Sequence, residues 1–410
     1  MTNSPSNRLR RRLVVAGGAG LATSLLARAA GAQGASVELP IVNGHRDLVA
    51  FPEKRPLIVI TTRPPQLETP FSVFNEGVIT PNDAFFVRYH LSDIPEVDAA
   101  KWQLKVGGDA AERPVTLSLD ELKRGFEPVE LAAVCQCAGN RRGLSEPHVP
   151  GVEWGYGAMG NAKWKGARLK DVLAKAGVKK EAIEVAFDGA DGPAMSGTPD
   201  FQKSLPVWKA LDENTLIAYE MNGQALPHWN GFPARLIVAG WTGTYWLKHL
   251  TEITVLSAPF KNFWMNTAYR IPVGKFPVID RFTSQESGGT TPITEMVVNS
   301  VITSPREGQV VKSGQPVEVK GIAWDNGAGI QTVEVSSDDG RTWQTATLDQ
   351  DMGRFSFRGF RHALKAGAKG DVTILARATN RQGATQVSQL IFNPAGYHNN
   401  VISRVTLRVG

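Results

Sequence analysis

The only two cysteines of the chain, Cys135 and Cys137, lie in the segment V-C-Q-C-A-G-N-R-R at residues 134–142. Cys137 directly precedes a basic loop, and neighbouring guanidinium groups favour the thiolate, the form of cysteine that binds a soft metal or attacks an electrophile. Cysteines at i and i+2 on a strand rarely reach disulfide geometry, and no C-x-x-C pair or histidine cluster lies nearby to complete a zinc site. We therefore predict that Cys137 carries the chemistry; the alternative is that both thiols are small buried core residues.

A second candidate group is the segment F-F-V-R-Y-H at residues 85–90. If it forms a short strand, Phe86, Arg88 and His90 share one face, because side chains alternate along a strand. A single Arg or His is more often an ordinary surface or core residue. However, a cation and an imidazole that lie side by side at the end of an apolar strand, as Arg88 and His90 would, indicate a functional site.

Two further segments could approach a polar ligand. The loop D-G-A-D-G-P at residues 188–193 contains Asp191 and follows an expected strand; a surface turn is the alternative there. The segment G-W-T-G-T-Y-W-L-K at residues 240–248 could hold an anionic group with backbone amides and Lys248, although it matches no phosphate-loop signature. A buried aromatic turn is the alternative for this segment.

Local patterns predict the elements that position these residues. The apolar run at residues 129–133 is an expected strand that ends next to the cysteine segment, and Ser118 with Glu121 forms a capping box for a short helix. Residues 168–176 read as an amphipathic helix that ends at Gly177, and Asn222-Gly223 reads as a hairpin turn.

The second half of the chain has an all-β pattern after a polar, Gly/Thr-rich stretch at residues 284–292. Short strands separated by turns, including a turn at Asp338–Gly340, predict an immunoglobulin-like sandwich of about 110 residues. The expected strands cover residues 316–322, 332–336, 342–348, 354–360, 372–378 and 389–392. We thus predict an α+β chain: an extended proline-rich arm at 33–84, a mixed α/β catalytic domain at 85–288 and the sandwich at 289–410.

The N-terminus carries an export pattern. Paired arginines at 10–12 precede an apolar run at 13–27 and an Ala-Gly-Ala cleavage site at 30–32, which predicts a twin-arginine signal and a periplasmic protein; an N-terminal membrane anchor is the alternative. Removing residues 1–32 removes five arginines and no acidic residue, so the formal net charge falls from +6 to +1. The basic charge therefore belongs to the signal, and no nucleic-acid partner is implied.

Five segments taken in order resemble the sulfite oxidase family of molybdenum enzymes: F-F-V-R-Y-H, Q-C-A-G-N-R-R, Y-E-M-N-G-Q, G-F-P-A-R and D-G-R-T-W, beginning at residues 85, 136, 219, 231 and 339. The resemblance covers nearly the whole chain beyond the signal. Within the family, the chain is most similar to the bacterial periplasmic sulfite dehydrogenases, which pass electrons to a c-type cytochrome. The resemblance implies oxidation of sulfite to sulfate at a molybdenum–molybdopterin centre.

The resemblance also implies roles for particular residues. Cys137 would ligate the metal, a soft thiolate beside the dithiolene sulfur of the cofactor. Arg88, His90, Arg142 and Tyr269 would form the substrate pocket, since guanidinium groups suit the oxygens of a small dianion. Asn230 stands where animal relatives have histidine, and Cys135 would be a core residue. The residues implied to hold the cofactor are Phe86, Val87, Arg88, Tyr89, His90, Cys137, Asp191, Asn230, Arg235, Trp246, Leu247 and Lys248.

The chain also departs from parts of the family pattern. It has no C-x-x-C-H motif, so we expect no haem in this chain and an electron acceptor that is a separate c-type cytochrome, bound as a haem subunit or met transiently; a homodimer is the alternative assembly. Two other functions stay open: a related molybdenum reductase acting on nitrate or a sulfoxide, and a non-enzymatic exported binding module.

Overall fold

The computed structural model describes residues 35–278 and 280–410, so the predicted export signal lies outside the described residues. The chain is mostly β, and the expectation of a mixed α/β catalytic domain overstated its helical content. The four described α-helices are short: α2 (Leu119–Arg124), α3 (Leu169–Ala176), α4 (Val207–Ala210) and α5 (Phe263–Asn266). In the described residues, no helix combines the length and the apolar character needed to cross a membrane.

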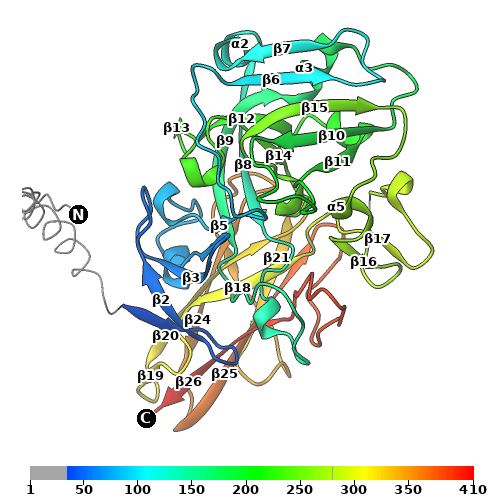
Figure 1. Ribbon diagram of the computed structural model, residues 1–410. Helices are drawn as coiled ribbons and strands as arrows, with labels where there is room; N and C mark the ends of the chain where they lie inside the picture. The colour runs from blue at the N-terminus through cyan, green and yellow to red at the C-terminus, as the bar shows by residue number, and fades with distance from the viewer. Residues whose placement is uncertain (1–34, 279) are drawn as a thin grey trace, which may run out of the picture.

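The first part of the chain forms a five-stranded antiparallel sheet, drawn in blue in Figure 1. We expected an extended arm here; the proline-rich segment instead pairs with itself. Proline has no N–H to donate, but at the start of a strand or between strands no hydrogen bond of the sheet is lost. Pro65 can therefore be the first residue of a strand. Residue Arg88 belongs to the last strand of this sheet. In order, the strands are β1 (Ser36–Glu38), β2 (His45–Val49), β3 (Leu57–Thr62), β4 (Pro65–Glu68) and β5 (Val87–Arg88).

Two larger sheets enclose the main core. One has the order β11 (Lys203–Pro206), β10 (Glu184–Gly189), β15 (Leu250–Leu256), β6 (Gln103–Gly107), β7 (Val115–Ser118). The other has the order β13 (Gln224–Ala225), β12 (Thr215–Met221), β9 (Met159–Arg168), β8 (Pro128–Gln136), with β14 (Arg235–Val238) also paired to β12. Helix α3 contacts strands of both sheets and contributes Leu169, Val172 and Leu173 to the core between them.

Several local predictions for these elements are confirmed. Ser118 and Glu121 form the capping box at the start of α2, and α3 ends at Gly177, whose φ is 72°. Asn222 and Gly223 both have positive φ and close the β12–β13 hairpin, as a type I′ turn requires.

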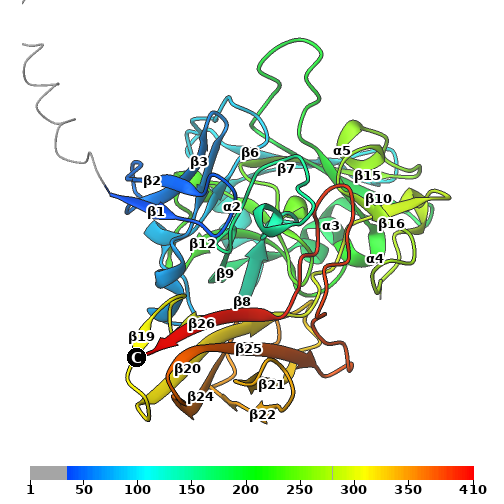
Figure 2. The same cartoon turned by 90° about the horizontal axis from the view of Figure 1, so that it is seen from below.

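The C-terminal part is built from two sheets packed around a second core. One contains β18 (Asn299–Ser304), β20 (Pro316–Trp324), β24 (Arg358–Lys365) and β23 (Thr347–Leu348); the other contains β19 (Val310–Val311), β26 (Ser403–Val409), β25 (Gly370–Asn380), β21 (Ile330–Ser336) and β22 (Gln344–Thr345). A small hairpin of β16 (Arg270–Pro272) and β17 (Thr290–Pro292) precedes them. The predicted strand at 389–392 is wrong: this stretch is irregular. Figure 2 shows that the red segment before β26 leaves the C-terminal sheets and reaches the first part of the molecule.

Candidate active site

Strand β8 delivers the cysteine segment into the site, as predicted. The strand ends at Gln136, and the next residues turn: the Cys137 amide donates to the Ala158 carbonyl at 2.9 Å, and the Asn140 amide donates back to the Cys137 carbonyl at 2.9 Å. Both thiols are free; Cys135 is buried and Cys137 is half-buried. The expected absence of a bridge between them is therefore confirmed.

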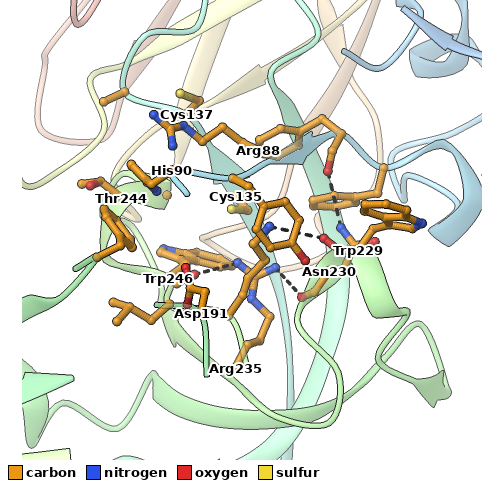
Figure 3. Close-up of a pocket in the computed structure, with 18 of the residues that line it drawn as sticks. Arg88, His90, Cys135, Cys137, Asp191, Trp229, Asn230, Arg235, Thr244 and Trp246 are labelled. Carbon is orange, nitrogen blue, oxygen red and sulfur yellow. Dashed lines mark hydrogen bonds between the residues drawn. The ribbon is translucent and has the colours of Figure 1, made fainter. Parts of the chain in front are cut away.

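The two thiols line one cavity, and most of the predicted site residues share it. Figure 3 shows Cys137 beside the guanidinium group of Arg88, with Arg235, Asp191 and Trp246 on another side of the cavity. The predicted residues that line the cavity are Phe86, Arg88, Tyr89, His90, Cys137, Asp191, Asn230, Arg235, Trp246, Leu247, Lys248 and Tyr269. Of the site residues predicted from sequence, only Val87 and Arg142 do not line it.

Val87 and Arg142 point elsewhere for identifiable reasons. Val87 alternates with its neighbours on β5 and is buried in a small apolar cluster with Leu57 and Leu67. The Arg142 guanidinium donates to the carbonyl oxygens of Ala395 and Val152, at 2.8 and 3.1 Å, so its side chain is directed toward the C-terminal part. The prediction that Arg142 lines the substrate pocket is therefore wrong for this cavity.

Three basic side chains around the cavity, the buried Arg235 and the half-buried Arg88 and Lys248, have donor capacity left over. Arg235 donates to the Asn230 and Trp246 carbonyls at 3.0 and 2.9 Å, yet its Nε has no partner in the described structure. Arg88 has unpartnered Nε and Nη1 atoms, and burial lowers the pKa of Lys248 well below its usual value. Buried cations without partners are costly. Their side chains therefore fit an anionic group, such as the phosphate and dithiolene of a molybdopterin.

Two further polar residues lie in or next to the cavity wall: Asp191 lines the cavity, and His249 contacts the lining residue Tyr89 from behind. Burial raises the pKa of Asp191 to about 6, while nearby Lys248 opposes that rise. Burial also lowers the pKa of His249 to about 3, so this imidazole is neutral at pH 7. Its Nδ1 lies 2.6 Å from the Phe232 carbonyl and must donate there, which leaves Nε2 to accept from the Tyr89 hydroxyl at 2.8 Å.

His90 and Tyr269 form a hydrogen-bonded pair on the cavity wall. The His90 Nε2 lies 2.5 Å from the Tyr269 hydroxyl, and the imidazole stacks on Phe201 at 3.3 Å between ring centres. Burial and the charges of Arg88, Lys248 and Lys203 lower the pKa of His90 well below its usual value, and burial raises that of Tyr269. At neutral pH the pair therefore consists of an uncharged imidazole and an uncharged phenol.

Several cavity residues escaped sequence-based prediction. Cys135 was expected to be a core residue; it is buried, but it also lines the cavity beside Arg235, and burial raises the pKa of its thiol to about 11. The i, i+2 spacing of the cysteines was the signal that both share one face. No local pattern marked Phe201, whereas Thr244 lies in the segment 240–248 that the sequence had indicated without naming this residue. The unpredicted lining residues are Phe85, Cys135, Ala138, Phe201, Trp229, Gly243 and Thr244.

The chain resembles characterised families and structures in both its parts. The oxidoreductase molybdopterin binding domain matches residues 90–264, and the Mo-co oxidoreductase dimerisation domain matches residues 290–410. The structure also matches the crystal structure of the sulfane dehydrogenase SoxCD from Paracoccus pantotrophus, with a TM-score of 0.70, 26% identity and coverage of 85% of this chain and 88% of that one.

Curated relatives include sulfite oxidases. The mitochondrial sulfite oxidase of Homo sapiens is 38% identical over 311 residues, which cover 74% of this chain and 55% of that protein. The sulfite oxidase of Gallus gallus is 38% identical over 310 residues, with 73% and 65% coverage. A nitrate reductase [NADH] of Hordeum vulgare is 30% identical over 389 residues, with 88% and 42% coverage. The aligned part of the chain thus spans less than two thirds of each of these proteins.

These matches agree with the geometry of the cavity, which is lined by the two thiols and by the basic side chains of Arg88, Arg235 and Lys248. The two matched domains follow one another in the order the sequence motifs predicted. The chain belongs to the sulfite oxidase family of molybdenum oxidoreductases and uses a molybdenum–molybdopterin cofactor.

Proposed function

We propose that this protein oxidises sulfite to sulfate and passes the electrons one at a time to a c-type cytochrome. The observation that carries the proposal is the cavity itself, which brings the Cys137 thiol, the unpartnered Arg88 guanidinium and the His90–Tyr269 pair to one place. Relatives that are named sulfite oxidases support the same substrate.

The residues divide into two groups by the chemistry they offer. Cys137 would hold the metal, while Arg235, Lys248 and Asn230 would hold the anionic pterin. When bound, the molybdenum cofactor supplies the two-electron oxidation and the transfer of oxygen. Arg88 would bind the sulfite dianion by charge-assisted hydrogen bonds. The Tyr269 hydroxyl would hydrogen-bond to the substrate oxygen and exchange its proton with His90 Nε2.

The remaining features of this proposal concern location, assembly and domain type. The twin-arginine pattern at residues 1–32 supports export to the periplasm, where a c-type cytochrome is a suitable acceptor. We further propose a catalytic domain at 85–288 and an immunoglobulin-like C-terminal domain at 289–410, preceded by an N-terminal segment that contains strands β1 to β4. The two-sheet packing of the last part supports that domain type.

The test is sulfite-dependent reduction of a c-type cytochrome by purified protein whose molybdenum content has been measured. Nitrate and a sulfoxide are assayed in parallel with a reduced dye, because one relative is a nitrate reductase. Sulfite turnover with about one molybdenum per chain supports the proposal, since the cavity has a single cysteine ligand position for one cofactor. If the protein binds molybdenum and turns over nitrate or a sulfoxide but not sulfite, it is a molybdenum reductase and the proposed sulfite oxidation is wrong.

A further inference from the structure

Tyr397 from the C-terminal part stacks on Tyr269 of the candidate active site. The two rings are 5.7 Å apart between centres and nearly parallel, at 7°, which is the offset stacking that aromatic pairs favour. Tyr397 is buried and belongs to the main core of the first part, although it lies in the matched Mo-co dimerisation domain. The C-terminal part thus reaches the site through this residue.

The backbone that presents Tyr397 is held by its own hydrogen bonds. The Asn393 side chain donates from Nδ2 to the Tyr397 carbonyl at 2.8 Å and accepts from the Tyr397 amide at 3.0 Å. Between them, Gly396 has φ 60°, and a Cβ at this position would lie 2.8 Å from Cγ of Arg142. The segment is therefore rigid, and it depends on glycine to approach Arg142 closely.

The same segment contacts a second residue of the predicted substrate pocket. Arg142 Nε donates to the Ala395 carbonyl at 2.8 Å, and the guanidinium carbon lies 5.4 Å from the centre of the Tyr397 ring. The Tyr397 ring consequently packs against both Arg142 and Tyr269. Neither contact requires the Tyr397 hydroxyl, for which no hydrogen bond is recorded among the described residues.

The Tyr269 ring has other neighbours, but Tyr397 is the aromatic residue that stacks nearly parallel on it. The Trp264 ring centre lies 6.2 Å away at 39°, and Lys203 Nζ lies 5.2 Å from the centre of the Tyr269 ring. The Tyr269 backbone has φ 57°, in the left-handed region that residues other than glycine adopt at a cost. The Tyr269 hydroxyl must nevertheless stay within 2.5 Å of His90 Nε2. A ring that is free to rotate about χ1 would lose this bond.

We propose that Tyr397 is a positioning residue, whose ring holds Tyr269 in the orientation that keeps its hydroxyl beside His90. The C-terminal domain then sets the geometry of the active site in addition to any role in assembly. The expected effect on turnover rests on the proposed oxidation of sulfite, whereas the expected effect on the Tyr269 ring does not.

The test compares Tyr397→Phe, which keeps the ring, with Tyr397→Leu, which removes the stack. Each is made in the wild-type chain and in a Tyr269→Phe chain, and each protein is checked for molybdenum content and thermal unfolding. In the wild-type chain, Tyr397→Leu should lower kcat for sulfite about 10- to 100-fold, because a misplacement of about 1 Å in a reacting geometry can cost that much. Tyr397→Phe should stay within about two-fold, since it preserves the stacked ring.

The Tyr269→Phe chain separates positioning from a general structural role. If Tyr397 acts through the Tyr269 hydroxyl, Tyr397→Leu should lower kcat far less in that chain than in the wild-type chain. An equal loss in both chains, or a loss in Tyr397→Phe as large as in Tyr397→Leu, would overturn the proposal. So would unchanged kcat in Tyr397→Leu.

A crystal structure of Tyr397→Leu gives a readout independent of turnover; Tyr397→Met replaces it if the leucine variant does not fold. A Tyr269 ring displaced from His90, with the segment at 393–400 otherwise in place, supports the proposal. An undisplaced ring contradicts it. If the wild-type protein binds molybdenum but does not oxidise sulfite, the proposed function fails, while this structural comparison still decides the role of Tyr397.

Discussion

At the scale of single residues, the site depends on side chains whose charged group or thiol forms few or no bonds to the rest of the described protein. Arg88 is the clearest case, because two of its nitrogens are buried without a partner in the described structure. Cys137 differs from Cys135 in exposure and in the loop that follows it. In the proposed function, these two residues are the metal ligand and a binding residue for the anionic substrate.

Replacing Cys137 with serine should remove the metal and the activity together. A hydroxyl is a harder and less acidic ligand than a thiol, so it is a poor substitute toward a soft metal centre. Molybdenum analysis of the purified variant measures the effect. Cys135→Ser is the matched comparison, since it changes the other thiol of the segment and should retain bound molybdenum; equal metal content in both variants would contradict the assignment.

Lys54 gives a residue-scale prediction for pH dependence. Its ammonium is buried and donates to the Asn82 and Phe85 carbonyls and to Asn230 Oδ1, at 2.6, 3.1 and 2.7 Å. Burial lowers its pKa from 10.5 to about 7. Between these values the unfolded chain binds a proton that the folded chain does not, so stability rises with pH across the window, by at most about 1.4 kcal/mol per pH unit.

The measurement is chemical denaturation of wild type and Lys54→Met across that window. The free energy of unfolding of the wild type should rise relative to that of the variant as the pH increases. Below pH 7 the difference should be constant, because Lys54 is then charged in both states. Parallel pH curves throughout would show that Lys54 does not titrate on folding.

At the scale of elements, the N-terminal sheet braces the loop that carries Cys137. Strand β4 ends at Glu68, whose buried carboxylate accepts from the amides of Gly155 and Gly157, both at 2.8 Å. The neighbouring Ala158 carbonyl in turn binds the Cys137 amide. The sheet is therefore connected to the cysteine loop through residues 155–158, which bond to Glu68 at one end and to Cys137 at the other. The expectation of an extended arm did not include this connection.

Replacing Glu68 with glutamine should weaken this brace. An amide has one acceptor oxygen, so one glycine amide loses its partner, at a cost of about 1–3 kcal/mol in the free energy of unfolding. Urea denaturation near neutral pH measures the loss. Glu181→Gln is the control, because Glu181 is exposed; a similar change in the two variants would contradict a specific role for Glu68.

At the scale of the whole molecule, the two parts are joined by buried polar contacts next to the active site. Arg141 adjoins the cysteine loop, and its guanidinium donates to Asn299 Oδ1 at 3.0 Å and to the Val401 carbonyl at 2.9 Å. Its own carbonyl accepts from Asn399 Nδ2 at 3.1 Å. Together with the Arg142–Ala395 bond, these contacts hold the C-terminal part against the loop that follows Cys137.

Replacing Arg141 with methionine should loosen this junction. Both acceptors would keep only a longer bond from Gln386 Nε2, at 3.3 Å each, so the loss should be about 1–3 kcal/mol in total, and the C-terminal part should unfold at a lower temperature than the rest. Calorimetry of wild type and variant measures the effect: the variant's unfolding should begin at a lower temperature and be broader or split. Arg408→Met is the matched control, because Arg408 is an exposed residue of β26; an unshifted unfolding profile in Arg141→Met would argue against coupling through Arg141.

Much of the fold and of the site could be predicted from sequence because the signals are local. The capping box of α2, the Asn222-Gly223 turn and the delivery of Cys137 by a strand each depend on residues a few positions apart. Family motifs added the cofactor and a set of residues, most of which line the cavity. In the C-terminal part β20, β21 and β25 were predicted, whereas β18, β19 and β26 were missed, the strand expected at 354–360 begins only at Arg358, and 389–392 was misread.

Tertiary structure alone decided which way the less constrained side chains point. Arg142 reaches a carbonyl 253 positions away, and Lys54 reaches an amide oxygen 176 positions away. Tyr397 stacks on the ring of Tyr269, which lies outside the C-terminal part. Such contacts follow from how separate sheets pack, and they leave no periodicity or spacing along the sequence. The amino-acid sequence therefore determined the chemistry of the site, while packing between distant elements determined its geometry.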